Sequence, residues 1–257
     1  MRMGIQSRLL ILAAALFGVA SAHNAAADSA TLAVAANFLT PLEALRRAFE
    51  QGGAHKLSVV SASTGQLYAQ ITNGAPFDVL LSADQETVAK LVVDGRGDGA
   101  SRFTYALGTL VLFTRDPSKF APLNLDTLRR RDFRWLAIAN PDLAPYGLAA
   151  QQTLEALGLW DTLQPRLVRG QSIAQTFAQA ETRNADLALV AMSQAIAYGD
   201  PTAYFPVPEQ LHAPLRQDAV LLAHGRENAA AREFLKFLRS AAATKTIADY
   251  GYRPGAP

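Results

Sequence analysis

The sequence contains no cysteine among its 257 residues. Disulfide bonds and a lipid-modified N-terminal cysteine are therefore both excluded. A chain without cross-links needs a substantial hydrophobic core. About 230 residues outside the N-terminal segment are enough to build one, as a single large domain or as two lobes.

Metal-binding and catalytic patterns are also missing. No two of His55, His212 and His224 have metal-ligand spacing, so we expect surface or packing roles and no metal site. The sequence has neither a Gly-x-Ser-x-Gly elbow nor a Gly-x-x-x-x-Gly-Lys phosphate loop. Asp78 and Asp84 flank a predicted strand, where capping is favoured over acid–base catalysis. We therefore predict no catalytic residues, no cofactor and no enzymatic activity.

Neither sign of charge is in clear excess. The chain has 24 Lys and Arg against 22 Asp and Glu, and removing Arg2 and Arg8 with the N-terminal segment leaves 22 of each. The densest basic run, residues 129–131, is interpreted as a solvated helix end. The charge pattern therefore gives no indication of a nucleic-acid partner.

The first 27 residues have the pattern of a secretory signal peptide. Arg2 and Arg8 precede an apolar stretch at 9–20, and small residues follow, with candidate cleavage positions after Ala22 and Ala27. The stretch is too short to span a bilayer comfortably, so a cleaved signal at 1–27 is favoured over an uncleaved anchor. No later segment is apolar for long enough to cross a membrane. We expect an exported protein that begins near Asp28 and, in a Gram-negative bacterium, is free in the periplasm.

Runs of strand length alternate with helical patterns along the rest of the chain. The β-α-β-α-β order implies a parallel sheet with helices on both faces, and the theme occurs twice, so we predict an α/β protein with two lobes. β-rich runs at 107–114 and 216–222 are the candidate crossings between the lobes. Lobe 1 is then 28–106 with 216–257, and lobe 2 is 107–215. The predicted helices are 42–49, 66–72, 86–94, 147–157, 173–181 and 229–250.

Two strand-to-helix turns in the first predicted lobe carry neutral hydrogen-bond donors. Residues 35–41 include Asn37 and a Thr40-Pro41 pair that predicts a helix start, and residues 61–67 place hydroxyls and a glycine at the next helix start. Neither turn contains Lys, Arg, Asp or Glu. Free N–H groups at a helix start attract anions, and a fully ionised tetrahedral oxyanion offers acceptors only. Ordinary helix capping explains the same residues equally well on physics alone.

Two similar turns occur in the second predicted lobe, at 140–147 and 170–173. The first contains Pro and Gly, which stiffen a loop and expose its backbone, and the second places the Ile173 N–H at a helix start. Each turn alone is weak evidence. Four such turns drawn from both lobes predict a closed cleft that binds a small anion.

The segment Gly-Ala-Pro-Phe-Asp-Val-Leu-Leu-Ser-Ala-Asp at 74–84 is the most specific family pattern in the sequence. With it, the chain resembles the periplasmic molybdate-binding proteins of ABC importers over essentially its whole length after the N-terminal segment. The resemblance implies a type II periplasmic-binding-protein fold, in which each lobe is a mostly parallel sheet flanked by helices and the hinge is two crossing segments. The other matching segments are 34–38, 63–71, 139–141, 145–147, 157–160, 185–190 and 250–252.

The resemblance also implies a function and a site. It implies capture of molybdate, and of tungstate with it, and delivery to the membrane permease of an ABC importer by a protein that we expect to be a monomer. Thr64 keeps the hydroxyl of the second turn, whereas Asn37 stands where many members have Ser. Tyr146 and Ile173, which stand where Ala and Val are common, contribute their backbone. Carried over by position, the ligand-binding residues are Ala36, Asn37, Ser63, Thr64, Tyr146 and Ile173.

The clearest departure from the family pattern is at Ala191. Many members donate a tyrosine hydroxyl from a Val-Tyr-x-Ser-Asp-Ala segment, but here the sequence is Val-Ala-Met-Ser-Gln-Ala at 190–195. We hypothesise that the Tyr146 hydroxyl or the Asn37 amide replaces the lost donor, because a tyrosine appears in one binding turn where another has been lost.

Alternatives remain at this point. Sulfate, phosphate or another small anion is an alternative ligand, since selectivity would come from a cavity size that the sequence does not give. A ferric-ion site would need clustered tyrosines with a His or Glu, and no such cluster is evident. A secreted two-lobed α/β hydrolase or transferase would need a nucleophile or an acid–base pair in the cleft. A sensory domain that signals to a membrane receptor is compatible with the same fold.

Overall fold

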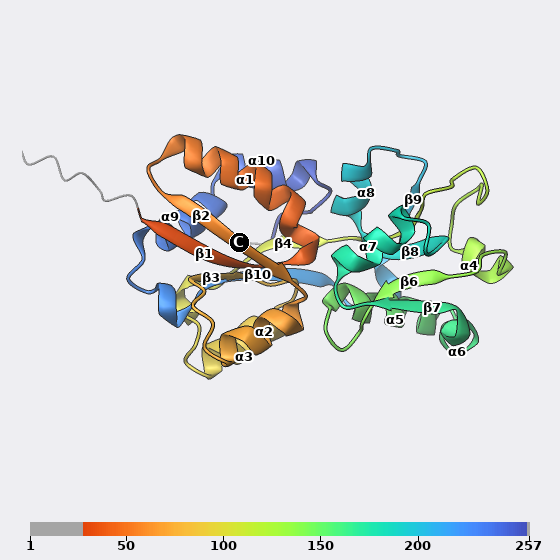
Figure 1. Ribbon diagram of the computed structural model, residues 1–257, viewed down its shortest axis with the longest axis horizontal. Helices are drawn as coiled ribbons and strands as arrows, with labels where there is room; N and C mark the ends of the chain where they lie inside the picture. The colour runs from red at the N-terminus through yellow and green to blue at the C-terminus, as the bar shows by residue number, and fades with distance from the viewer. Residues whose placement is uncertain (1–27, 256–257) are drawn as a thin grey trace, which may run out of the picture.

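A computed structural model describes residues 28–255 of the chain. The expected signal peptide at 1–27 lies outside the described residues. The chain forms two α/β lobes side by side, each built on its own five-stranded sheet (Figure 1). This arrangement confirms the two-lobed architecture expected from the alternating pattern.

Lobe 1 contains the sheet with strand order β2-β1-β3-β10-β4. Alternate residues of β1 face opposite sides, with Leu32 and Val34 in one buried cluster and Ala33 in another. Helices α1, α9 and α10 cover the first face and α2 and α3 the second (Figure 1). The strands are β1 (Ser29–Ala35), β2 (Lys56–Ala62), β3 (Val79–Leu81), β4 (Phe103–Gly108) and β10 (Leu215–Leu221), and the helices are α1 (Leu39–Gly52), α2 (Thr64–Thr72), α3 (Glu86–Val93), α9 (Ala229–Leu238) and α10 (Ala241–Asp249).

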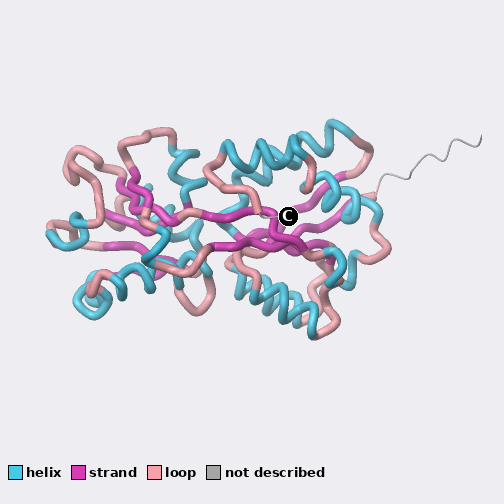
Figure 2. The backbone as a smooth tube through the Cα atoms, turned by 180° about the vertical axis from the view of Figure 1, so that it is seen from behind, coloured by secondary structure: helices cyan, strands magenta, loops and turns pink. Residues whose placement is uncertain are grey.

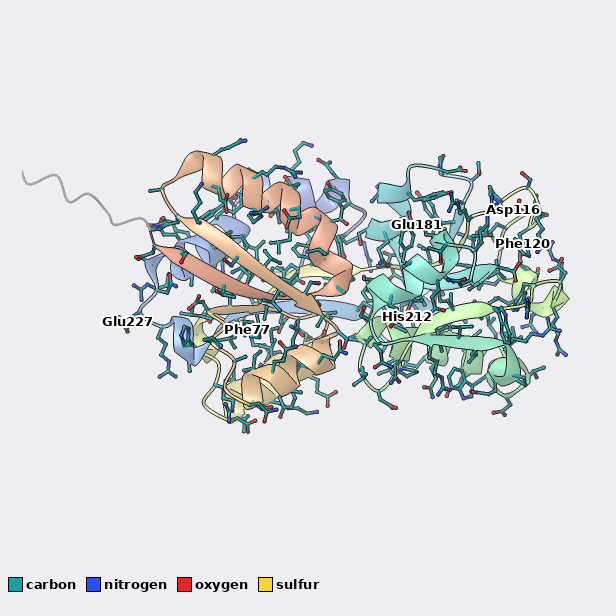
Figure 3. The ribbon with its side chains drawn as sticks, viewed as in Figure 1. Phe77, Asp116, Phe120, Glu181, His212 and Glu227 are labelled. Carbon is teal, nitrogen blue, oxygen red and sulfur yellow. The ribbon has the colours of Figure 1, made fainter. Side chains whose placement is uncertain are left out.

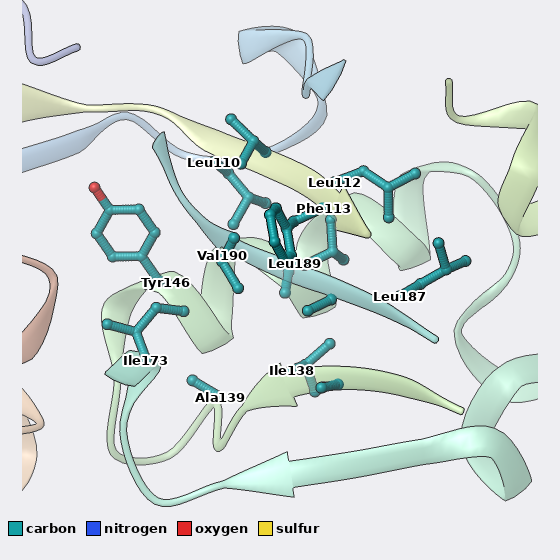
Figure 4. Close-up of a cluster of buried hydrophobic side chains, with 14 of the residues drawn as sticks. Leu110, Leu112, Phe113, Ile138, Ala139, Tyr146, Ile173, Leu187, Leu189 and Val190 are labelled. Carbon is teal, nitrogen blue, oxygen red and sulfur yellow. The ribbon is translucent and has the colours of Figure 1, made fainter. Parts of the chain in front are cut away.

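Lobe 2 contains the sheet with strand order β7-β6-β8-β5-β9. Its core strands are apolar apart from Thr114 because helices cover both faces, and the buried cluster of Figure 4 is drawn mainly from β5, β6 and β8. The strands are β5 (Leu110–Thr114), β6 (Leu136–Ala139), β7 (Leu167–Gly170), β8 (Leu187–Ala191) and β9 (Tyr204–Pro206), and the helices are α4 (Asp126–Arg130), α5 (Pro145–Ala156), α6 (Trp160–Leu163), α7 (Ile173–Glu181) and α8 (Met192–Tyr198).

Both sheets are mixed, which differs from the expected mostly parallel sheets. In lobe 1, β1 pairs in parallel with β2 and β3, but β10 runs antiparallel to both β3 and β4. In lobe 2, β6 pairs in parallel with β7 and β8, but β5 runs antiparallel to β8 and β9. Every antiparallel pair includes β5 or β10, the strands that directly follow the two crossings between the sheets.

The chain crosses between the sheets at two places. The first crossing is Thr109, between the end of β4 and the start of β5. The second runs from β9 to β10 through the short 3-10 helix η4 (Glu209–Leu211) and His212, which Figure 3 labels. Seen from behind, the strands of the two lobes follow one another across the junction (Figure 2). The elements on either side of these crossings build the cleft.

Two helix ends differ from the sequence-based expectation. The 3-10 turn η1 (Ala36–Phe38) leads directly into α1, which begins at Leu39 without a side-chain cap, so the predicted cap at Thr40 is wrong. The predicted helix at 229–250 is two helices, because Ser240 accepts a hydrogen bond from the Ala243 N–H and caps a new start. Within residues 28–255, no helix has both the length and the apolar character needed to cross a bilayer.

Candidate functional site

A small cavity lies where the starts of α2, α5 and α7 and the turn η1 meet. About 10 Å³ of it is open to the centre of a water-sized sphere, which is roughly the room of one water molecule. No charged side chain lines it. The lining residues are Ala35, Ala36, Asn37, Ser63, Thr64, Ala83, Ala144, Pro145, Tyr146 and Ile173, and they include all six residues that the sequence places in the site.

The start of α2 presents a hydroxyl that is free to donate. Thr64 Oγ1 accepts a hydrogen bond from the Ala83 N–H at 3.2 Å, and its own proton has no acceptor within the described residues. The Ser63 hydroxyl, in contrast, donates to Gln66 Oε1 at 2.9 Å, and the same oxygen accepts from the Ser63 N–H at 3.1 Å. Ser63 therefore serves as the helix cap, and Thr64 is the better placed side-chain donor.

The start of α5 presents a backbone donor. Pro145 occupies the first turn of the helix, and the Ala144 carbonyl accepts from the N–H groups of Gly147 and Leu148. The Tyr146 N–H lies before the first residue that can bond within the helix, and in residues 28–255 it has no hydrogen-bond partner. The positive end of the helix dipole adds to its attraction for an anion.

The start of α7 presents a second backbone donor. Ser172 caps the helix by accepting from the Gln175 N–H at 3.3 Å, which leaves the Ile173 N–H without a partner in the described part of the chain. Gln194 fixes this turn from α8. Its Nε2 donates to the Ile173 carbonyl at 3.1 Å, while its Oε1 accepts from the Ala191 N–H at 3.1 Å. One hydrogen bond of the Gln194 side chain thus holds the Ile173 carbonyl, and the other fixes that side chain to the end of β8.

The hydrogen bonds distinguish the two candidates for the missing tyrosine donor. The Tyr146 hydroxyl accepts from Gln217 Nε2 at 3.3 Å, and Figure 4 shows this hydroxyl at the end of the ring farther from Ile173 and Ala139. Both N–H groups of the Asn37 amide are engaged, with Gln217 Oε1 at 2.9 Å and the Tyr252 hydroxyl at 3.0 Å. The Asn37 amide therefore has no proton left for an anion, whereas the Tyr146 hydroxyl keeps its own proton, and its role in place of the hydroxyl lost at Ala191 stays a prediction.

Sequence reasoning missed the polar network that holds Asn37. Gln217 also accepts from the Tyr105 hydroxyl at 3.0 Å, so its amide joins the site to the strands of the hinge. Burial raises the pKa of Tyr105, Tyr146 and Tyr252 above that of free tyrosine, so these hydroxyls keep their protons and remain able to donate. A bulge in the pairing of β10 with β4 falls between Gln217 and Asp218, and both of these neighbours are buried.

The two carboxylates that flank β3 have structural partners. Asp78 accepts from the Thr31 N–H at 2.6 Å and contacts His224 Nδ1 at 2.9 Å. Asp84 accepts from the Thr87 N–H at 2.7 Å at the start of α3, and burial raises the pKa of Asp84. Within residues 28–255, no three His, Asp or Glu side chains gather in a way that would hold a metal ion. The site offers uncharged hydrogen-bond donors, a chemistry suited to an anion that carries no proton.

The fold and this donor set are those of a solute-binding protein with its ligand cleft between two lobes. The model of the family of bacterial extracellular solute-binding proteins matches residues 30–253, and the chain belongs to this family.

Two relatives and one solved structure are similar to this chain over most of its length. The chain is 42% identical to the molybdate-binding protein ModA of Rhodobacter capsulatus over 228 residues, 89% of each protein. It is also 42% identical to ModA of Azotobacter vinelandii over 249 residues, 96% of this chain and 97% of that protein. A solved structure of the A. vinelandii periplasmic molybdate-binding protein superimposes with a TM-score of 0.84 at 37% identity, covering 89% of this chain and 99% of that one.

Proposed function

We propose that this protein captures molybdate, and tungstate with it, in the cleft between its lobes and delivers it to the membrane permease of an ABC importer. The observation that carries the proposal is the cavity itself, which two lobes line with neutral donors at three helix starts. Family membership and two molybdate-binding relatives at 42% identity support the choice of anion. The proposed role is binding and delivery, without a chemical step.

The proposed ligands are the six residues named from the sequence. Thr64 donates its hydroxyl, and Tyr146 and Ile173 donate backbone N–H groups that have no other partner in the described residues. Ala36 and Asn37 contribute backbone from η1, and Ser63 shapes the turn through its cap. Molybdate and tungstate are dianions without a proton to donate, so a site of donors alone satisfies every oxygen.

Binding must involve movement of the lobes. The cavity has about 10 Å³ open to the centre of a water-sized sphere, so a tetrahedral oxyanion cannot enter while the lobes stay in contact. We propose that the lobes separate to admit the anion and close over it, replacing its water with preorganised donors. Closure also creates the combined surface that the permease would recognise.

Further parts of the proposal concern the whole protein. We propose export through a cleaved signal at 1–27, a periplasmic location and a monomer without a nucleic-acid partner. We place the lobe limits at 28–106 with 216–257 and at 107–215. The strand membership of the two sheets supports these limits to within two residues, since β4 continues to Gly108, β5 begins at Leu110 and β10 begins at Leu215.

The experiment is a thermal-shift panel on the chain from Asp28 onward, with molybdate, tungstate, sulfate and phosphate, followed by titration calorimetry. A ligand at about 100 times its dissociation constant stabilises the folded state by about 2.7 kcal/mol, which raises the melting temperature by several degrees. We expect this shift with molybdate and tungstate. Sulfate is the closest competitor in charge and shape, and it is smaller because its bonds to oxygen are shorter.

Two outcomes would contradict the proposal. A shift with sulfate or phosphate but not with molybdate would reassign the ligand, and no shift with any oxyanion would reject the anion site. As a matched control, the panel is repeated on Thr64→Val, which removes the side-chain donor from the cavity. The molybdate shift should shrink in this variant, and its melting temperature without anion should also fall, because the Ala83 N–H loses its acceptor.

A further inference from the structure

The two lobes are joined by hydrogen bonds that do not involve the anion ligands' free donors. Ser193, in the first turn of α8 in lobe 2, donates from Oγ to the Asn37 carbonyl in lobe 1 at 2.8 Å. The hydroxyl of Tyr252 donates to the same carbonyl at 2.8 Å, and the two hydroxyl oxygens are 3.1 Å apart. These groups are buried, with 1% of Ser193 and 4% of Tyr252 exposed.

Tyr252 belongs firmly to lobe 1. Its ring packs edge to face on Phe38 with centroids 5.4 Å apart, and the neighbouring Arg253 exchanges backbone hydrogen bonds with Leu107 of β4. The Tyr252 hydroxyl also accepts from the Asn37 amide at 3.0 Å. Tyr252 and Asn37 therefore present one preformed polar surface, and Ser193 reaches the Asn37 carbonyl from the other lobe.

We propose that Ser193, with Tyr252 and the Asn37 carbonyl, forms a latch that holds the closed form and sets how long the anion stays bound. The proposal rests on the proposed function. Ser193 and Tyr252 are positioning residues, because neither lines the anion cavity. When the lobes separate, the Ser193 hydroxyl must leave the Asn37 carbonyl, and both groups then exchange the bond for water.

The latch is coupled to one anion donor through α8. Gln194 follows Ser193 and holds the Ile173 carbonyl at 3.1 Å, so the first turn of α8 touches lobe 1 on one side and the start of α7 on the other. Closing the latch therefore brings the Ile173 N–H to its place opposite the donors of lobe 1. This arrangement links the lobe contact to the completion of the site.

The test measures closure directly. Because the chain has no cysteine, Gln70→Cys on α2 and Ala156→Cys on α5 give two exposed positions, one on each lobe, for paired nitroxide labels. Distance distributions are recorded with and without molybdate for the labelled parent, Ser193→Ala and Tyr252→Phe. We expect each variant to lower the ratio of closed to open molecules by about threefold to tenfold, the effect of one lost hydrogen bond.

Kinetics give a second, independent readout. Labelled molybdate is released from the loaded protein into an excess of unlabelled molybdate, and association is followed separately. Ser193→Ala and Tyr252→Phe should speed dissociation by about threefold to tenfold while association stays within about twofold, because the anion enters the open form. A residue that only stabilises the fold would not produce this split.

Two control variants match the substitutions. Tyr250→Phe removes a half-buried tyrosine hydroxyl that has no hydrogen bond within the described residues, and Ser240→Ala removes a helix cap far from the cleft. If Ser193→Ala leaves the distances with and without molybdate and the dissociation rate unchanged, or if Tyr250→Phe acts as strongly as Tyr252→Phe, the latch is rejected. If molybdate fails to close the labelled parent, the proposed function fails, and the latch is then judged on the anion-free distances alone.

Discussion

The backbone N–H of Gly65 donates a hydrogen bond of 2.9 Å to the carbonyl of Leu143. Gly65 lies in the first turn of α2 in lobe 1, and Leu143 lies in the loop before α5 in lobe 2, so this bond joins the lobes beside the anion cavity. The backbones approach so closely that a Cβ on Gly65 would lie 3.1 Å from the Leu143 carbonyl oxygen and 3.2 Å from its Cα. A side chain at Gly65 would therefore crowd the contact between the two loops.

Gly65→Ala should weaken anion binding by about threefold to tenfold, because the Leu143 loop must retreat by a few tenths of an ångström and the Gly65–Leu143 hydrogen bond is strained. The melting temperature without anion should stay nearly the same, since the clash arises between lobes rather than within a core. Titration calorimetry with molybdate checks the first statement. The control is Gly53→Ala, where the nearest atom to the added Cβ is 3.8 Å away. Equal effects of the two substitutions would argue against lobe contact at Gly65.

Thr64 and Ser63 are neighbours whose hydroxyls should differ in importance. Thr64→Val should weaken molybdate binding by about tenfold to a hundredfold, because a hydrogen bond to a charged group contributes about 1.5–3 kcal/mol. Thr64→Ser should keep most of the affinity. Ser63→Ala should lower the free energy of unfolding by about 1 kcal/mol through loss of the α2 cap but change the affinity by less than about threefold, because the Ser63 proton is donated to Gln66. The reverse order of affinities in calorimetry would show that Ser63 supplies the donor.

The two-lobed α/β architecture could be predicted because the order of strands and helices follows from local hydrophobic periodicity. The strand-to-helix turns could also be located, since each follows an apolar run and precedes a helical pattern. Helix starts were less accurate. The cap predicted at Thr40 is wrong because η1 continues into α1 without a capping side chain. A 3-10 turn that runs into an α-helix without a capping side chain cannot be recognised from the residue types.

The polar network could not be predicted from one sequence. Ser193 meets Asn37 across 156 positions, and Tyr252 meets it across 215. Gln217 lies on the same face of β10 as Ala219 and Leu221, but its partners Asn37 and Tyr105 come from elements far away in the sequence. Nothing local marks these residues, and their importance depends on how the lobes meet.

Gly108, at the end of β4, leaves room for the Tyr146 hydroxyl. A Cβ at this position would lie 2.1 Å from that hydroxyl oxygen and 2.7 Å from Gln217 Nε2. Gly108→Ala should therefore displace both groups, cost about 1–3 kcal/mol of unfolding free energy through overpacking, and weaken molybdate binding by moving the start of α5. Urea unfolding and calorimetry check the two effects. Gly52→Ala is the control, because nothing lies within 4 Å of its added Cβ, and it should be close to neutral.

The raised pKa of Asp84 predicts that its contribution to stability decreases as pH rises. Burial raises the pKa of Asp84 above its ordinary value of 3.8, against the opposing hydrogen bonds from Thr87. Between that value and the raised native pKa, the folded protein binds more protons at this site than the unfolded chain, so the Asp84 contribution to stability falls as pH rises. Asp84→Asn removes the titration and keeps an oxygen for the Thr87 N–H. The stability of the variant relative to the parent should therefore rise with pH above about 3.8.

Asp186 provides the comparison with the opposite sign. Burial opposes the shift, but hydrogen bonds from Lys119 and from the N–H groups of Arg134 and Trp135 lower the pKa of Asp186 below 3.8. Its contribution is present above the unfolded pKa and is lost as pH falls through the native one, so Asp186→Asn should lose stability relative to the parent as pH rises. Urea unfolding of both variants and the parent between about pH 3 and 7 measures the two slopes. Slopes of the same sign would mean that burial does not set the direction of the pKa shift of Asp84.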